Sequence, residues 1–286
     1  MKVDYNAFFR LPHTKAEGDW LEERFRTMSA KESLVLAAAL QRSPPDNIVD
    51  GINLLTTLQN YLVCYPAPDY EALGLLSLKN RNISLPKDIL KHVDLTAIGE
   101  QFADEYPGLF IADSYVMYPT APEQKPYDGT NLAAIRDGWA VKVKLGSTFY
   151  PEGVWLRLPD YSDVSDTEQD ETIVALKELH AKKLEDCTIL DAVCVLPEAG
   201  NLMEQYCDPL RLISDGNSLG YLLDGSGDST EGFEEKLSAV FDNTRCRTLA
   251  EVLEVGQALY EGPYALPSKS ASPMEQRGMT MTQQPI

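Results

Sequence analysis

Hydrophobic positions in the first half of the chain recur at helical spacing. Ser29 and Glu32 have the spacing of a helix capping box, and an apolar run over residues 34–40 follows before Pro44-Pro45. Apolar side chains over residues 52–62 also recur at helical intervals and predict a second amphipathic helix. Shorter patterns predict helices over residues 70–76, 87–91 and 94–106. The first half is therefore expected to be mainly helical.

The second half mixes strand and helix patterns. Aromatic and β-branched residues predict a strand over residues 109–118, and alternating patterns predict strands over residues 139–145, 153–158 and 188–196. Helical patterns occupy residues 170–184, 231–241 and 248–260. Together these patterns predict an α+β protein built from helices and antiparallel strands.

Proline-rich stretches divide the chain. Residues 121–130 hold several prolines without periodicity and are predicted to be a linker between a helix-rich module over 1–120 and an acidic α+β module over 131–262. Residues 263–286 place prolines among Ser, Thr and Gln, which predicts a disordered tail.

Acidic residues dominate the composition and gather in one region. The 286 residues carry Lys+Arg 25 against Asp+Glu 44, a net charge of −19. Such a charge argues against direct binding to nucleic acid or to an anionic membrane. Residues 152–235 hold 20 acids and 5 bases, so this window alone carries 5 − 20 = −15. Solubility is the simplest explanation of acidity, but it does not require such concentration.

Cysteine usage and hydropathy predict a cytoplasmic protein. The five cysteines are odd in number and form no C-x-x-C pair, which is typical of reduced thiols. The sequence shows no apolar signal core and no apolar run near the ~18 residues that span a bilayer.

Sequence motifs for catalysis are weak. GNSLG at residues 216–220 resembles a nucleophile elbow around Ser218, but that elbow needs a later histidine, and His13, His92 and His180 all come earlier. A turn explains the motif better, and GSGDS at 225–229 lacks the lysine of a phosphate loop and is interpreted as a flexible connector. A hydrolase using Ser218 stays as an alternative, while the main expectation is a protein without catalytic activity.

Metal and cofactor motifs are equally weak. The acids between Asp160 and Asp170 miss the Gly and the terminal Glu of an EF-hand loop. Cys187 and Cys194 lie in an apolar stretch without zinc-ligand spacing and are predicted to be core residues. No metal and no cofactor are therefore expected.

The acids themselves suggest a use as phosphate mimics. Duplex DNA presents one negative charge per ~1.7 Å of axis, and rows of Asp and Glu at helical or alternating spacing can imitate it. Few bases interrupt such rows in the second half. The predicted partner-binding surface consists of Asp160, Asp163, Asp166, Glu168, Asp170, Glu171, Glu178, Glu185, Asp186, Asp224, Asp228, Glu231, Glu234 and Glu235.

The order of features over residues 29–118 resembles the ArdA antirestriction family of conjugative mobile elements. A leucine-rich helix is followed by INLL at 52–55, an aromatic segment at 61–65 and DYEALG at 69–74. The proline-led LPKDIL at 85–90 then precedes VDLTAIG at 93–99, and GLFIADSYV at 108–116 is close to the family's closing strand. GVWLRLP at 153–159 is similar to the strand that opens the family's modules.

This resemblance implies an elongated, modular α+β protein of small mixed domains of helices and antiparallel strands, which acts as a non-catalytic DNA mimic. Such a protein would evade host defence by occupying the DNA groove of a type I restriction-modification enzyme, or a related defence enzyme, as a competitive inhibitor. The family is often dimeric, so a homodimer is one expectation. The alternative is an accessory or scaffold protein of a mobile element that binds a basic protein partner.

Overall fold

Two small antiparallel sheets surrounded by helices make up this protein. The computed structural model describes residues 4–120, 125–135, 138–160, 171–227, 230–241 and 248–261. Each sheet has three strands, and this architecture confirms the predicted α+β class. The predicted tail over residues 263–286 lies outside the described residues.

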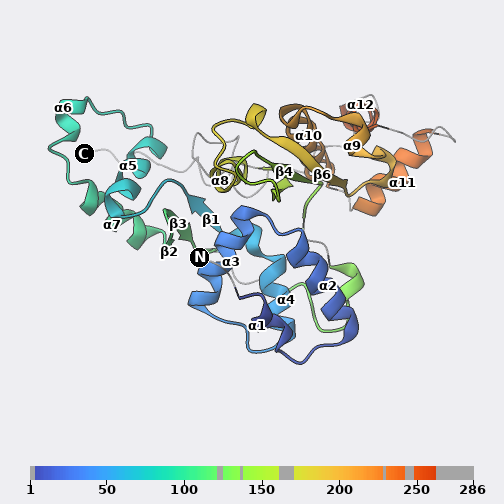
Figure 1. Ribbon diagram of the computed structural model, residues 1–286, viewed down its shortest axis with the longest axis horizontal. Helices are drawn as coiled ribbons and strands as arrows, with labels where there is room; N and C mark the ends of the chain where they lie inside the picture. Colours follow the sequence, from blue (N-terminus) through green and yellow to red (C-terminus); the bar gives the residue numbers. More distant parts are fainter. Residues whose placement is uncertain are drawn as a thin grey trace, which may run out of the picture.

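The α-helices of the first half lie in the sequence either before its sheet or between the first and second strands of that sheet (Figure 1). Its elements are α1 (Asn6–Phe9), α2 (Lys15–Arg26), α3 (Ala30–Arg42), α4 (Ile48–Thr56), η1 (Leu58–Asn60), β1 (Leu62–Cys64), α5 (Tyr70–Asn80), α6 (Lys87–Leu90), α7 (Leu95–Glu105), β2 (Gly108–Ile111), β3 (Ser114–Met117) and η2 (Leu132–Ala134).

The second half surrounds the other sheet with helices. Its elements are β4 (Val141–Gly146), β5 (Val154–Leu158), α8 (Glu171–Glu178), η4 (Leu184–Asp186), β6 (Thr188–Cys194), η5 (Pro197–Ala199), α9 (Leu202–Gln205), α10 (Pro209–Ser226), α11 (Thr230–Phe241) and α12 (Leu249–Glu261). We call residues 138–261 the C-terminal lobe.

Capping boxes set the starts of the two longest helices of the first half. The predicted box at α3 is present, since Ser29 Oγ accepts a hydrogen bond from the Glu32 amide and Glu32 accepts one from the Ser29 amide. Helix α2 begins with a second complete box, formed by Thr14 and Glu17. The sequence patterns above did not predict α2, although its capping signal is present in the sequence.

The first sheet separates two helical layers. Its strand order is β1-β3-β2, and the predicted single strand over residues 109–118 is in fact a hairpin that turns at Ala112, with φ of 52°. Val63 and Val116 pair across β1 and β3 and pack against the core of α1–α4. The neighbouring pair, Cys64 and Tyr115, belongs to a smaller core with α5 and α7. The helix-rich half therefore contains two cores.

Residues 125–135 pack onto the first core. The Tyr127 side chain is buried, and its hydroxyl donates a 2.8 Å hydrogen bond to Glu17. Asn53 holds the Tyr127 backbone at both its amide (2.8 Å) and its carbonyl (2.9 Å). The described part of the expected linker over 121–130 is thus fixed to α2 and α4, while residues 121–124 lie outside the described residues.

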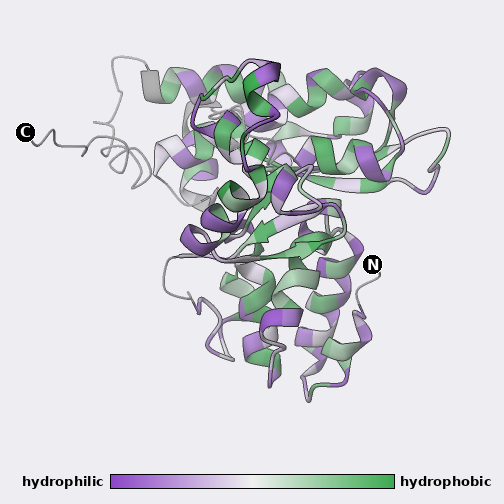
Figure 2. Ribbon diagram, turned by 90° about the vertical axis from the view of Figure 1, so that its left-hand side faces the viewer, coloured by the Kyte–Doolittle hydropathy of each residue, from purple (hydrophilic) through white to green (hydrophobic). Residues whose placement is uncertain are grey.

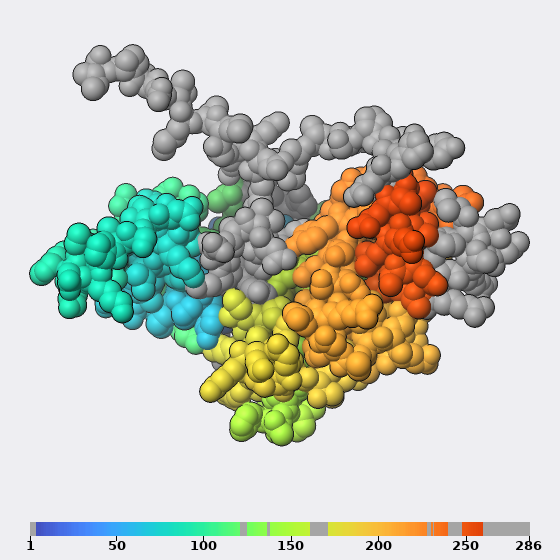
Figure 3. All heavy atoms as spheres, turned by 90° about the horizontal axis from the view of Figure 1, so that it is seen from above, coloured from blue at the N-terminus to red at the C-terminus, as the bar shows by residue number. Residues whose placement is uncertain are grey.

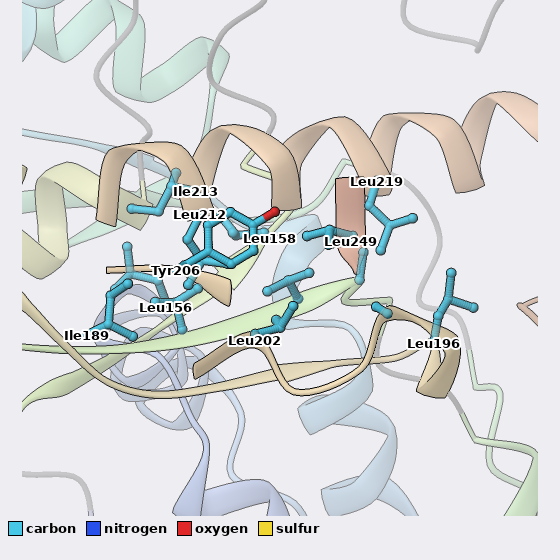
Figure 4. Packing of buried hydrophobic residues seen from close by; sticks show 14 of the residues in the cluster. Leu156, Leu158, Ile189, Leu196, Leu202, Tyr206, Leu212, Ile213, Leu219 and Leu249 are labelled. Atoms are coloured by element: carbon cyan, nitrogen blue, oxygen red, sulfur yellow. The ribbon is translucent and has the colours of Figure 1, made fainter. Parts of the chain in front are cut away.

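Helix α10 covers one face of the second sheet, whose strand order is β5-β4-β6 (Figure 4). Leu212, Ile213 and Leu219 point from this helix toward Leu156 and Leu158 of β5. Residues 216–220 lie inside this helix, so the expected turn is wrong. A Cβ at Gly220 would stand 2.3 Å from Pro159, which shows that this glycine serves close helix–sheet packing.

The expected flexible connector over 225–229 begins inside a helix, since its first two residues belong to α10. Ser226 is the last residue of α10, and Gly227 caps the helix in the left-handed region with φ of 65°. The last two residues of that stretch lie outside the described residues.

The α5–α7 helices and the C-terminal lobe lie at opposite ends of the molecule's long axis (Figures 1 and 3). Their helices carry mixed hydrophobic and hydrophilic faces, as expected for helices that cover a core on one side (Figure 2). The face of the second sheet that α10 leaves uncovered turns toward α2 and α3, and this junction positions the charged groups described next.

Candidate partner-binding surface and the ionic junction behind it

Basic side chains of the second sheet point into the junction with the first half. Lys142 on β4 is buried, and its Nζ donates a 2.9 Å hydrogen bond to Thr27 Oγ1. Arg157, its partner in the register of β5, forms a buried ion pair with Glu32 of α3. A β-bridge between Ser29 and Trp155 lies next to this pair. Two cations of the acidic lobe are therefore used inside the molecule.

Glu32 binds two arginines at once. Its carboxylate pairs with Arg157 and with Arg24 of α2, whose Nη1 donates a 3.0 Å hydrogen bond. Arg24 Nη2 also donates to the Leu55 carbonyl oxygen at 3.1 Å. Burial alone would raise the pKa of Glu32, but the two guanidinium groups outweigh it and lower this pKa to about 2. Glu32 is therefore ionised, and its charge is balanced within the junction.

Glu171 was predicted to lie on the exposed acidic surface, and this prediction is wrong. Its side chain is buried at the start of α8, where Oε1 accepts a 3.0 Å hydrogen bond from Ser29 Oγ. Oε2 accepts a 3.4 Å bond from the Arg157 amide. Burial raises the pKa of Glu171 to about 7. This carboxyl group holds α8 against α3.

Asp160 is also buried, which contradicts its predicted exposure. It follows β5, and its carboxylate accepts a 3.4 Å hydrogen bond from the Thr172 amide in the first turn of α8. Its amide donates to Asn217 Oδ1 at 2.7 Å, and its carbonyl oxygen accepts from the Tyr221 hydroxyl at 2.8 Å. Asp160 therefore connects the end of β5 to α8 and α10.

A third cation of this lobe also faces the first half. Lys177 on α8 forms an ion pair with Asp113, in the turn between β2 and β3. Its Nζ lies 4.8 Å from the centroid of the Tyr65 ring. Partial burial lowers the pKa of Lys177. Lys142, Arg157 and Lys177 are thus directed away from the outer surface of the C-terminal lobe.

The outer surface of this lobe is rich in carboxylates, although Lys182, Lys183 and Arg211 are exposed there as well. Glu178, Glu185, Asp186, Asp224 and Glu235 are exposed as predicted, whereas Glu234 is half-buried. Five further exposed acids among the described residues of this lobe were not predicted: Glu152, Glu204, Asp208, Glu251 and Glu254. Of the other predicted positions, the Glu231 backbone lies in α11 but its side chain is not described, and outside the described residues lie Asp163, Asp166, Glu168, Asp170 and Asp228.

Several of these exposed carboxylates are not held in ion pairs. Among the described residues, no ion pair involves Glu178, Glu185, Asp186, Glu204 or Glu235. Ion pairs of this lobe include those of Arg157, Lys177 and Arg211, and the last is a 3.9 Å contact with Asp215. The exposed charge of this lobe is therefore strongly negative.

The length of helix α10 indicates how far apart carboxylates of this lobe lie. Asp208 caps its first turn by accepting a 3.0 Å hydrogen bond from the Leu210 amide, and Asp224 lies in its last turn. Helix α10 has 18 residues. At 1.5 Å per residue it is about 27 Å long, roughly the rise of eight base pairs. Carboxylates therefore occur over a span comparable to a short DNA duplex.

A cleft of about 300 Å³ opens where α3, the β2–β3 turn, β5 and α8 meet. Ser33, Trp155, Lys177 and Glu178 are among its lining residues. Its one lining cation, Lys177, is already paired with Asp113, so the described walls offer no uncompensated positive charge to an anionic ligand.

Ser218 lies in a setting unlike a nucleophile elbow. Its hydroxyl donates a 2.9 Å hydrogen bond to the Ser214 carbonyl one turn earlier in α10. Within the described ranges, no group of three or more His, Cys, Asp or Glu side chains is arranged to hold a metal ion. A search of the same ranges for a helix long and apolar enough to cross a membrane finds none.

The chain was compared with family models, curated proteins and solved structures. No family model matches the chain, and neither a curated protein nor a solved structure matches it.

Proposed function

We propose that this protein is a non-catalytic DNA mimic that inhibits a DNA-binding defence enzyme, such as a type I restriction-modification enzyme. It acts in the cytoplasm as an antirestriction protein of a mobile element. The acidic outer surface of the C-terminal lobe occupies the enzyme's DNA groove and competes with the substrate duplex.

One observation carries this proposal. The acidic lobe directs Lys142, Arg157 and Lys177 toward the first half. Among the described residues, Glu178, Glu185, Asp186, Glu204 and Glu235 are exposed and take part in no ion pair. A plain solvated surface usually intersperses both signs of charge. Segregation of the two signs creates a field that attracts a cationic groove. A DNA-binding groove is such a surface, because it must neutralise phosphates.

Inhibition of DNA cleavage tests the proposal. A purified type I restriction-modification enzyme is incubated with its duplex substrate, ATP and increasing amounts of the protein. We expect cleavage to fall with added protein and the inhibition to weaken steeply as salt rises, since opposite charges are screened. A variant that reverses Glu178, Glu185, Asp186, Glu204 and Glu235 to Lys is expected to lose roughly 70-fold or more in potency, at about 0.5 kcal/mol or more per contact.

The matched control reverses five exposed acids of the first half: Asp19, Glu22, Glu71, Glu100 and Asp104. It changes the net charge equally and is expected to keep most of the inhibition. Equal loss in both variants would show that only net charge matters. Absence of inhibition by the wild-type protein across several defence enzymes would overturn the proposal.

A further inference from the structure

A small cationic surface projects from the end of the molecule opposite the acidic lobe. Residues 79–92, from the end of α5 through α6, carry Lys79, Arg81, Lys87 and Lys91 against Asp88, a net of 4 − 1 = +3. All four cations are exposed. In a chain with a net charge of −19, this segment reverses the prevailing sign. We call it the tip (Figures 1 and 3).

The tip also exposes aliphatic side chains. Ile83 is 45% exposed and Ile89 is 53% exposed, and Leu75 on the adjacent α5 is 47% exposed. Helix α6 buries none of its residues. Large aliphatic side chains grouped this way, with charges around them, are typical of a surface that another molecule covers.

The C-terminal lobe holds a surface of complementary character. Met203 on α9 is 39% exposed and Leu210 at the start of α10 is 53% exposed. Exposed Glu204 and Asp208 flank them in sequence. We call these four residues the corner. Exposed aliphatic groups close in sequence to several cations at one end of the molecule thus match aliphatic groups close to Glu204 and Asp208 at the other, where Arg211 also follows Leu210.

We propose that the tip docks on the corner of a second copy of this chain. The lobes that carry the two surfaces lie at opposite ends of the long axis, so the contact is head-to-tail and heterologous. Burial of Ile83 and Ile89 against Met203 and Leu210 supplies apolar contact, and the surrounding charges set the orientation. This inference does not depend on the proposed inhibition.

A second copy fits the tip better than a polyanion does. Duplex DNA would be attracted by the cations of the tip, but it offers little apolar surface to cover Ile83 and Ile89. Arg81 is also already paired with Glu105 at 3.1 Å. Between two copies at about 0.15 M salt, repulsion beyond ~8 Å is screened while contacts across the interface persist.

Sedimentation velocity at about 0.15 M salt tests the proposal. We expect the wild-type protein to associate with increasing concentration, in the range of about 10–100 µM that suits a small interface. Lys87→Glu with Lys91→Glu is expected to weaken association about tenfold, and so is Glu204→Lys with Asp208→Asn. Asn keeps the helix cap that Asp208 provides. A variant with all four changes in one chain should associate again, because the net charge of each surface then changes sign.

The control is Lys182→Glu with Lys183→Glu, two exposed residues outside the tip. It makes the same change in net charge and should leave association unchanged. Circular dichroism checks that each variant is folded. Any of three results would overturn the proposal. The wild-type protein could stay monomeric at 100 µM, about the upper limit expected. The control could weaken association as much as the tip variant does, or the four-change variant could fail to associate. Sedimentation of an unassociated chain with duplex DNA or anionic vesicles would assign the tip to that partner instead.

Discussion

Glu32 and Glu171 lie in the same junction, yet their surroundings shift their pKa values in opposite directions. Two arginines lower the pKa of Glu32 to about 2, while burial raises that of Glu171 to about 7. Lys31, Glu32 and Arg157 are the charged groups that act on Glu171. The position of each carboxylate relative to the guanidinium groups therefore decides its protonation state.

Replacing Glu171 with Gln should change the pH dependence of stability. The folded protein holds the Glu171 proton up to about pH 7, whereas the unfolded chain releases it near pH 4.3. Between these values the folded state binds more protons, so stability falls as pH rises. Thermal unfolding from pH 5 to pH 8 should show a steeper decline for the wild-type protein than for Glu171→Gln.

Glu32 does not disturb this window. Its lowered pKa stabilises the folded state above the unfolded value, and this stability is lost only as pH falls toward 2. Parallel curves for the wild-type protein and Glu171→Gln between pH 5 and pH 8 would contradict the assignment.

Sequence reasoning at the residue scale predicted where acids occur but not which are buried. Glu171 meets Ser29, which is 142 positions earlier in the chain, and no local pattern signals that contact. Asp160 is similarly buried against Asn217 and Tyr221, more than fifty positions later. The acids around η4 are exposed because a short 3-10 turn with no buried residue carries them.

At the scale of elements, α5 and α7 approach each other closely at two glycines. A Cβ at Gly74 would stand 2.0 Å from the Leu95 carbonyl oxygen, and one at Gly99 would stand 1.9 Å from that of Tyr70. Backbone atoms cannot move aside as a flexible side chain can. These two glycines therefore allow the helices to touch.

Gly74→Ala should destabilise the protein by about 1–3 kcal/mol, since it overpacks this contact. Urea unfolding measures the effect. The control is Gly225→Ala in α10, where a Cβ would meet nothing within 4 Å. Alanine favours a helix over glycine, so this change should be neutral or stabilising by up to about 1 kcal/mol. Similar losses in both variants would contradict the packing argument.

Local signals predicted many of the elements. The capping box at Ser29 set the start of α3, and the alternating pattern of residues 139–145 set β4. Helix α10 was misinterpreted because Gly216 and Gly220 suggest a turn when their neighbours in space are unknown. Those glycines face Leu158 and Pro159 of a distant strand, which is a tertiary requirement.

At the scale of the whole molecule, the ionic junction joins the C-terminal lobe to the first half. Arg157→Ala removes one partner of Glu32 from a buried site and should cost about 3–5 kcal/mol. Differential scanning calorimetry should show a lower midpoint and separate unfolding of the two parts. Arg211→Ala is the control, because that side chain is 71% exposed and lies 3.9 Å from Asp215. It should cost less than about 1 kcal/mol, and equal losses would argue against a structural role for the junction.

The overall charge distribution was only partly predictable. The excess of acids in the second half is visible in the sequence. That Lys142 and Arg157 point inward depends on how the second sheet meets α2 and α3, which no local pattern specifies. The proposed function depends on this segregation more than on the net charge.

Competition for a DNA-binding enzyme tests that function most directly. Fluorescence anisotropy follows a labelled duplex bound to a purified type I restriction-modification enzyme while the protein is added. We expect the protein to displace the duplex. The protein concentration that displaces half of the bound labelled duplex should rise as unlabelled duplex is added. A ternary complex, in which the duplex stays bound while the protein binds the enzyme, would contradict mimicry and identify a scaffold instead.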